Sequence, residues 1–317
     1  MGVLITGMHR SGTSILAQWV AQTGLGTGDG PLFDVNPANP RGLYERQDVV
    51  RFNDRWLGTL GGSWWAPPFI KEQTWRSIDA GELDKDRFAL DYFRADFSNW
   101  YVKDPRLSLL LPLWDRLALQ KIPAIVAVRQ PRDVAMSLNM RNGLTLRRGL
   151  ALWLAYNRAI FSHTLGRSFV VLDLARSMER PEQTAENLLS FLQEMGLKVS
   201  GDPFVITENL EAGLLRQHYD RLEGTAESLA KELDEAYYYL RSLHGEHQRD
   251  VHHSLPLPDW ASETLDELTE FWDMKVRCDI LQDQLRTTAT KLQEAQNRLE
   301  ELHNVPSVRV WRLIKRG

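Results

Sequence analysis

An arginine, two glycines and several hydroxyl side chains lie close together in the segment Gly7-Met8-His9-Arg10-Ser11-Gly12-Thr13-Ser14. The apolar run before this segment predicts a strand, and the pattern after it predicts a helix. A glycine-rich loop between a strand and a helix can surround an anion, because its backbone N–H groups and the positive end of the helix point inward. The segment therefore predicts a phosphate-type anion site in which Arg10 supplies the countercharge.

This loop differs from the one that nucleoside triphosphatases use. Gly7 and Gly12 have the spacing of a P-loop, but Thr13 stands where that motif has its lysine. No acidic strand end offers a clear partner for magnesium either. Arg10 can neutralise an anion without a metal, and Thr13 and Ser14 can donate hydrogen bonds at the start of the helix. We therefore expect an anion site that works without a metal ion.

A second basic segment follows another apolar run. Ile125-Val126-Ala127-Val128 predicts a buried parallel strand, and it leads through Arg129-Gln130-Pro131-Arg132-Asp133 into a helix that contains Ser137. Proline suits the start of this helix, and Ser137, eight residues after Arg129, can face the same way as that arginine. Ligand sites of open α/β sheets lie at the carboxyl ends of the strands, so we expect both basic segments there.

Together the two segments resemble the PAPS-dependent sulfotransferases, which take a sulfuryl group from 3′-phosphoadenosine-5′-phosphosulfate (PAPS). Arg10-Ser11-Gly12-Thr13-Ser14 resembles the 5′-phosphosulfate loop of bacterial and Golgi-type members, and Arg129 with Ser137 resembles the pair that binds the 3′-phosphate. The resemblance implies a P-loop NTPase-like sulfotransferase fold, PAPS as donor, adenosine 3′,5′-bisphosphate as product and no metal. It also implies a cofactor site formed by His9, Arg10, Ser11, Gly12, Thr13, Ser14, Arg129 and Ser137.

Sulfuryl transfer requires a base that takes a proton from the attacking group. The stretch Asn36-Pro37-Ala38-Asn39-Pro40-Arg41-Gly42-Leu43-Tyr44-Glu45 is similar to the segment that supplies the catalytic glutamate in this family. The resemblance therefore implies that Glu45 is the base. The alternative is that Glu45 only favours the N-terminus of the next helix.

The loop Lys103-Asp104-Pro105-Arg106 is similar to the family's loop on the acceptor side of the cleft. Lys103 would then stabilise charge on the leaving phosphosulfate oxygen. Asp104 is an alternative base, or a partner that orients Lys103 or Arg106. His9 is a further candidate base, or a residue that shapes the first loop.

The elements that must position these residues follow an alternating pattern. Residues 1 to about 200 alternate between short apolar runs and helical patterns, as α/β domains do. Strands are expected at Val3–Thr6, Trp100–Lys103, Ile122–Val128 and Phe169–Leu172. Helices are expected at Thr13–Thr23, Asp48–Leu60, Leu107–Leu119, Arg132–Met140, Leu146–Phe161 and Pro181–Met195. The sequence therefore predicts an α/β fold with a parallel β-sheet flanked by helices.

Two later segments carry heptad patterns. Apolar or small residues alternate at spacings of four and three from Leu215 to Leu243, and again from Phe271 to Leu302. We expect a catalytic domain over residues 1–218 and a helical coiled-coil extension over residues 219–303, with a hinge at about 244–259. An antiparallel hairpin within the chain is favoured. A homo-oligomer, or two helices lying on the catalytic domain, are the alternatives.

Other segments suggest where an acceptor and a membrane could lie. Trp64-Trp65 could stack on a sugar near the acceptor site or could pack in the core. Arg216 could contact the cofactor. The basic aromatic tail, residues 304–317, resembles tails of bacterial surface-polysaccharide enzymes, which implies a glycan or lipid-linked acceptor. Such a tail could rest on an anionic membrane surface or dock on a partner. The histidines between the heptad segments are expected to be solvated rather than to bind a metal: His244, His247, His252 and His253.

Composition limits the remaining classes. The 317 residues carry a net charge of −4, which gives no reason to expect a nucleic-acid partner. Cys278 is the single cysteine, so an internal disulfide and a cysteine-based zinc site are excluded, and a cytoplasmic location is expected. A strand-like run that begins at Val3 argues against a signal peptide. A P-loop-like kinase or nucleotide hydrolase and a non-catalytic coiled-coil scaffold remain the alternative functions.

Overall fold

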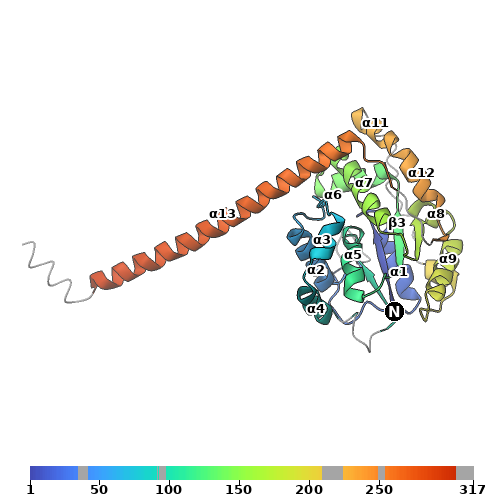
Figure 1. The fold of residues 1–317 in the computed structure, drawn as a ribbon, viewed down its shortest axis with the longest axis horizontal. Coiled ribbons are helices and arrows are strands. Elements are labelled where there is room, and N and C mark those ends of the chain that lie inside the picture. Colours follow the sequence, from blue (N-terminus) through green and yellow to red (C-terminus); the bar gives the residue numbers. More distant parts are fainter. Residues whose placement is uncertain (35–41, 91, 93–97, 209–223, 249–253, 305–317) are drawn as a thin grey trace, which may run out of the picture. The chain divides into compact units, whose positions relative to one another are not determined.

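The computed structural model describes residues 1–34, 42–90, 92, 98–208, 224–248 and 254–304 (Figure 1). The chain divides into two compact units, Met1–Thr269 and Glu270–Gly317. None of the helices within the described ranges combines the length and apolar character that crossing a bilayer requires.

The first unit is built around a five-stranded sheet with the order β2-β1-β3-β4-β5. Its strands are β1 (Gly2–Gly7), β2 (Trp100–Lys103), β3 (Ala124–Val128), β4 (Phe169–Asp173) and β5 (His247–Gln248). The first four are parallel, and short β5 runs antiparallel to β4. All residues of β1 to β4 are buried, which explains their nearly continuous apolar sequences. The predicted α/β fold with a largely parallel sheet is confirmed.

Helices surround this sheet (Figure 1). The first half of the unit contains α1 (Thr13–Gln22), α2 (Gln47–Thr59), α3 (Glu72–Ser77), α4 (Ala80–Ala89), α5 (Leu107–Ala118) and α6 (Pro131–Asn142). The second half contains α7 (Leu146–Ser162), α8 (Leu174–Glu179), α9 (Pro181–Glu194), α10 (Pro203–Thr207), α11 (Thr225–Glu232) and α12 (Asp234–Ser242). All six helices predicted before residue 200 are present.

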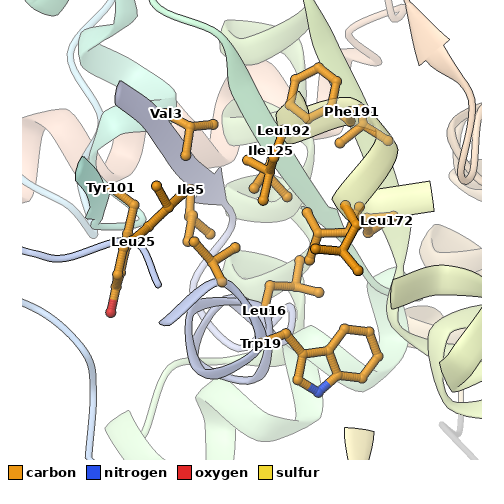
Figure 2. Packing of buried hydrophobic residues seen from close by; sticks show 14 of the residues in the cluster. Val3, Ile5, Leu16, Trp19, Leu25, Tyr101, Ile125, Leu172, Phe191 and Leu192 are labelled. Carbon is orange, nitrogen blue, oxygen red and sulfur yellow. The ribbon is translucent and has the colours of Figure 1, made fainter. Parts of the chain in front are cut away.

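A hydrophobic core joins the sheet to α1 and α9. Alternate residues of the strands point to the same face, so Val3, Ile5, Ile125 and Leu172 form one apolar surface. Figure 2 shows these side chains packed with residues of the two helices, namely Leu16, Trp19, Phe191 and Leu192. The contacts fix the start of α1, and with it the end of the loop that follows β1.

The first heptad segment differs from its expectation. In its described part the chain forms two helices, α11 and α12, instead of one long helix. The apolar side chains of Leu229, Leu233 and Leu240 are buried, because α11 packs against α7 and α12 packs against β4. A narrow apolar stripe on a helix can pack against the surface of a domain as well as against a partner helix. In this segment the stripe packs within the first unit.

The second heptad segment lies in one helix, α13 (Asp259–Asn304). The start of α13 belongs to the first unit: Arg147 Nε donates to Thr264 Oγ1 at 2.7 Å, and Trp260 Nε1 donates to Glu232 at 2.8 Å. Ala261 and Leu268 are buried. The division between units therefore falls at Thr269, inside a helix, whereas the sequence placed a domain boundary at residue 218.

Several predicted features lie outside the described residues. They are the early part of the first heptad segment with Arg216, the histidines His252 and His253, the stretch from Asn36 to Arg41, and the tail from Val305 onward. Two histidines of the predicted hinge are described. His244 Nδ1 accepts from the backbone N–H of Asp173 at 3.0 Å, and His247 lies 2.6 Å from Glu194.

Candidate active site

Two glycines shape the loop between β1 and α1. Gly7 has a φ of 141°, and a Cβ added there would lie 2.4 Å from the carbonyl oxygen of Ala127. Gly12, the N-cap of α1, has a φ of 90°, and an added Cβ would lie 2.8 Å from Leu174 Cδ1. Glycine is needed at both positions, since L side chains would be strained and would collide. The backbone of the loop can therefore approach a ligand closely.

The two basic segments meet at the carboxyl edge of the sheet. Arg10 Nε donates to Ser137 Oγ at 2.7 Å across 127 positions of sequence. Arg129 Nη1 donates to the backbone carbonyl of Arg10 at 3.2 Å, and Arg129 also pairs with Asp133 at 3.4 Å. The structure thus brings together the first loop, the end of β3 and the first half of α6.

The start of α1 presents polar groups to the same region. No side chain caps its N-terminus, and its first turn contains no acidic residue. The first N–H groups of a helix have no intrahelical partner, so this end attracts negative charge. Ser11 Oγ and His9 Nε2 are buried, and neither has a hydrogen-bond partner among the described residues. Buried polar atoms of this kind usually bind a ligand or water.

His9 lies in an aromatic environment. Its ring is 4.7 Å from the ring of Trp64 and 5.8 Å from that of Tyr156, measured between centroids. Burial, followed by the positive charges of Arg106 and Lys103, lowers the pKa of His9 well below its usual range. The imidazole is therefore neutral at pH 7. Through this contact with His9, Trp64 packs against the loop.

Glu45 and Lys103 form an ion pair beside the helix start. Lys103 Nζ lies 2.5 Å from Glu45 Oε1, and the two side chains are 2% and 9% exposed, the lysine first. The same ammonium donates to Ser14 Oγ at 3.2 Å and to the carbonyl of Leu43 at 3.0 Å. The predicted base and the predicted leaving-group lysine are thus in contact with each other, and the lysine also contacts Ser14 in the first turn of α1.

Asp104 is fully buried in a hydrogen-bond network. It accepts from Asn53 Nδ2 at 2.9 Å, from the backbone N–H of Arg106 at 2.9 Å and from Arg106 Nη1 at 3.0 Å. Trp114 Nε1 in turn donates to Asn53 Oδ1 at 2.9 Å, and Arg106 Nε donates to Asp54 at 2.6 Å. Although burial alone would lower the pKa of Arg106, the charges of Asp104 and Asp54 raise it above its usual range.

The sequence interpretation missed Asn53 and Trp114. One signal was available for Asn53, because it lies within the buried stripe of α2, among Val49, Val50, Phe52, Trp56 and Leu57. A polar residue in an apolar stripe must have a hydrogen-bond partner when it is buried. The sequence does not say which residue that partner is.

Comparisons with known proteins add little to this geometry. No family model matches the sequence, and the curated proteins contain no match. Among solved structures, the chain is similar to the sulfotransferase domain from the Synechococcus PCC 7002 olefin synthase. The TM-score is 0.38 and the identity 17%, over 86% of this chain and 94% of that one. A likeness this weak carries no argument about the reaction.

Proposed function

We propose that the chain is a sulfotransferase that moves a sulfuryl group from PAPS to a hydroxyl or amine of an acceptor, a glycan or a lipid-linked saccharide. The observation that supports this most directly is the 2.7 Å contact of Arg10 with Ser137. It joins two anion-binding segments from different strand ends at one edge of the sheet. A donor with a phosphate on each side of its ribose requires two such segments.

The residues present fit this donor. His9 Nε2 and Ser11 Oγ are buried without a hydrogen-bond partner among the described residues, so a ligand can bind to them. The N-terminus of α1 favours a negatively charged ligand. The 5′ side would be held by the loop residues Arg10, Ser11, Gly12, Thr13 and Ser14, and the 3′ side by Arg129 and Ser137. PAPS supplies an activated sulfuryl group attached to a phosphate. A metal ion is not needed for charge neutralisation where arginines are available.

The contacts of Glu45 and Lys103 are compatible with separate roles for the two residues in the proposed reaction. Oε1 of Glu45 lies 2.5 Å from Lys103 Nζ, and the other carboxylate oxygen, Oε2, can accept the proton of the acceptor hydroxyl. Lys103 Nζ also contacts Ser14, and it can therefore stabilise negative charge that develops at the start of α1. In this proposal the lysine orients the Glu45 carboxylate and stabilises the leaving group.

Asp104 is better placed as an orienting residue than as the base. Its carboxylate is occupied by Asn53 and Arg106, and the side chain is fully buried. A base must reach the proton that it takes, which the two groups bound to Asp104 prevent. We therefore propose that Asp104 fixes Arg106 and that Glu45 is the base.

Calorimetric titration with adenosine 3′,5′-bisphosphate tests the proposal without knowledge of the acceptor. We expect micromolar binding in the absence of metal, and weaker binding of ATP with Mg²⁺. Arg129→Ala should weaken the bisphosphate about tenfold or more, because a charge-assisted hydrogen bond is lost. Arg76→Ala is the matched control, since the Arg76 side chain is 79% exposed, and it should leave the affinity unchanged.

Two other outcomes would contradict the proposal. A preference for ATP with Mg²⁺ would identify a kinase or a nucleotide hydrolase. Failure to bind either nucleotide would leave a non-catalytic scaffold as the better interpretation of the chain.

A further inference from the structure

The second unit carries an exposed apolar stripe along α13. Apolar or small residues occupy the a and d heptad positions from Phe271 to Leu302. Seven of these side chains are more than half exposed: Phe271 51%, Met274 57%, Leu281 62%, Leu285 73%, Leu292 60%, Leu299 55% and Leu302 59%. A continuous stripe of this kind on a helix is typical of an interface, because exposed apolar rows are otherwise avoided.

We propose that this stripe pairs with the same stripe of a second copy of the chain, as a parallel, in-register, two-stranded coiled coil. The inference does not depend on the proposed function. The charges beside the stripe, the residues at its a and d positions and the position of the single cysteine all suit pairing with a second copy.

The flanking charges favour the parallel arrangement. Three of the four g positions that flank the stripe's described part are cationic: Arg277, Lys291 and Arg298. In a parallel pair, each g residue faces the e residue five positions later on the partner, so Arg277 would face Gln282 and Lys291 would face Gln296. In an antiparallel pair aligned over the whole stripe g faces g, which would bring Arg277 of one copy against Arg298 of the other. Like charges in such positions are unfavourable.

One cation that flanks the stripe is already paired within the helix: Lys275, at an e position, has its Nζ 2.7 Å from Asp279. Other acidic residues of α13 occupy the outer b, c and f positions, where a two-stranded pair leaves them in water: Asp273, Asp283, Glu294, Glu300 and Glu301. The stripe itself contains no charged residue, so that pairing would bury none.

The polar residue of the stripe can also be buried. Thr288 occupies a d position, and its hydroxyl donates to the carbonyl of Gln284 at 2.8 Å within the helix. A buried hydroxyl with a partner costs little. Cys278 occupies an a position, where the thiol behaves as a small apolar group.

Cys278 gives a direct test on the full-length protein, because it is the only cysteine and is exposed in the single chain. In a parallel in-register pair the two a-position thiols face each other within reach of a disulfide. In an antiparallel pair aligned over the whole stripe they would be roughly 25 Å apart, from the rise per helical residue. Mild oxidation with diamide should therefore produce a covalent dimer on a non-reducing gel.

The matched control moves the thiol to the outer face of the same helix. Cys278→Ser combined with Asp283→Cys places the cysteine at an f position, and this variant should form little covalent dimer. Cross-linking of the control as fast as the wild type would overturn the proposal, since collisions or another face would explain it.

Mass in solution supplies an independent measurement. The 36.5 kDa chain should sediment as a dimer at micromolar concentration. Leu285→Lys, at an a position, should shift it to monomer, and Thr290→Lys, at an outer f position, should not. A monomeric wild type, a higher oligomer, or a dimer that resists Leu285→Lys would each overturn the inference.

Discussion

Glu45 and Lys103 illustrate the cost of building a charged site in a folded protein. Their side chains are almost completely buried, so each ion has lost most of its hydration. The attraction between them offsets that loss only while both are present. Buried ion pairs contribute little net stability on average, so folding alone does not account for this pair, in agreement with the catalytic role proposed for it.

Removal of one partner should therefore be costly. Glu45→Gln or Lys103→Met alone should each lower the free energy of unfolding by about 3–5 kcal/mol, because a buried charge is left uncompensated. The double variant should lose less than the sum of the two, with a coupling of roughly 1–3 kcal/mol. Urea unfolding of the four proteins measures this cycle. Strict additivity would mean that the pair does not interact in solution.

His163 gives stability a dependence on pH. Burial, and then the charge of Arg167, lowers its pKa from 6.5 to about 4. Between these values the unfolded chain binds a proton that the folded chain does not, so the free energy of unfolding falls as pH falls from about 6.5 to about 4. From pH 7 to pH 5 this group should account for about 2 kcal/mol of the loss.

Urea unfolding of wild type and His163→Gln at both pH values tests this contribution. His244, whose pKa burial also lowers to about 4, should keep some pH dependence in the variant. The variant should nevertheless lose less stability than the wild type on acidification. If the free energy of unfolding of the two proteins fell equally from pH 7 to pH 5, His163 would not have the lowered pKa that its burial implies.

The loop between β1 and α1 acts as one element whose shape depends on its glycines. A left-handed backbone conformation costs an alanine about 1–2 kcal/mol. Gly12→Ala should lower the free energy of unfolding by more than this, because the added Cβ would also lie 2.8 Å from Leu174. Gly143→Ala is the matched control. Gly143 ends α6 with a φ of 68° and has nothing within 4 Å of an added Cβ, so only the backbone cost remains.

Thermal unfolding and titration with adenosine 3′,5′-bisphosphate distinguish the two glycine variants. Gly12→Ala should be the less stable and should bind the bisphosphate more weakly, whereas Gly143→Ala should bind it normally. Equal behaviour of the two would mean that the loop adapts to a side chain at position 12.

At the level of elements, the sequence predicted the four parallel strands of the sheet but not the short strand β5. Buried parallel strands are short apolar runs bounded by loops, and β1, β2, β3 and β4 all have that form. The meeting of Arg10 with Ser137 followed from the rule that strand ends of one sheet share an edge. The partners of Asp104 did not follow, because contacts such as that with Asn53 depend on side-chain packing between distant helices.

The two heptad segments show a limit of periodicity. An apolar stripe states that one face of a helix must be covered, but not what covers it. Leu229 and Leu240 are covered by the first unit, whereas Leu281 and Leu285 remain exposed on α13. Identical spacing thus has two different structural outcomes in one chain.

At the scale of the whole molecule, the division between the two units falls within α13. Its position predicts where the chain can be truncated without destabilising the first unit. Ala261, Thr264 and Leu268 are buried in the first unit, and Arg147 is bonded to Thr264. A chain that ends at Thr269 keeps these contacts. A chain that ends at Pro258 loses them all.

The two truncations should therefore differ sharply. The free energy of unfolding of residues 1–269 should be close to that of the full-length chain, and this fragment should still bind adenosine 3′,5′-bisphosphate. Residues 1–258 should lose about 3–5 kcal/mol, because apolar contacts disappear and Arg147 is left without its partners. Urea unfolding measures both. If the longer truncation proved as unstable as the shorter one, residues beyond Thr269 would contribute to the folding of the first unit, and the second unit would not be separable from it.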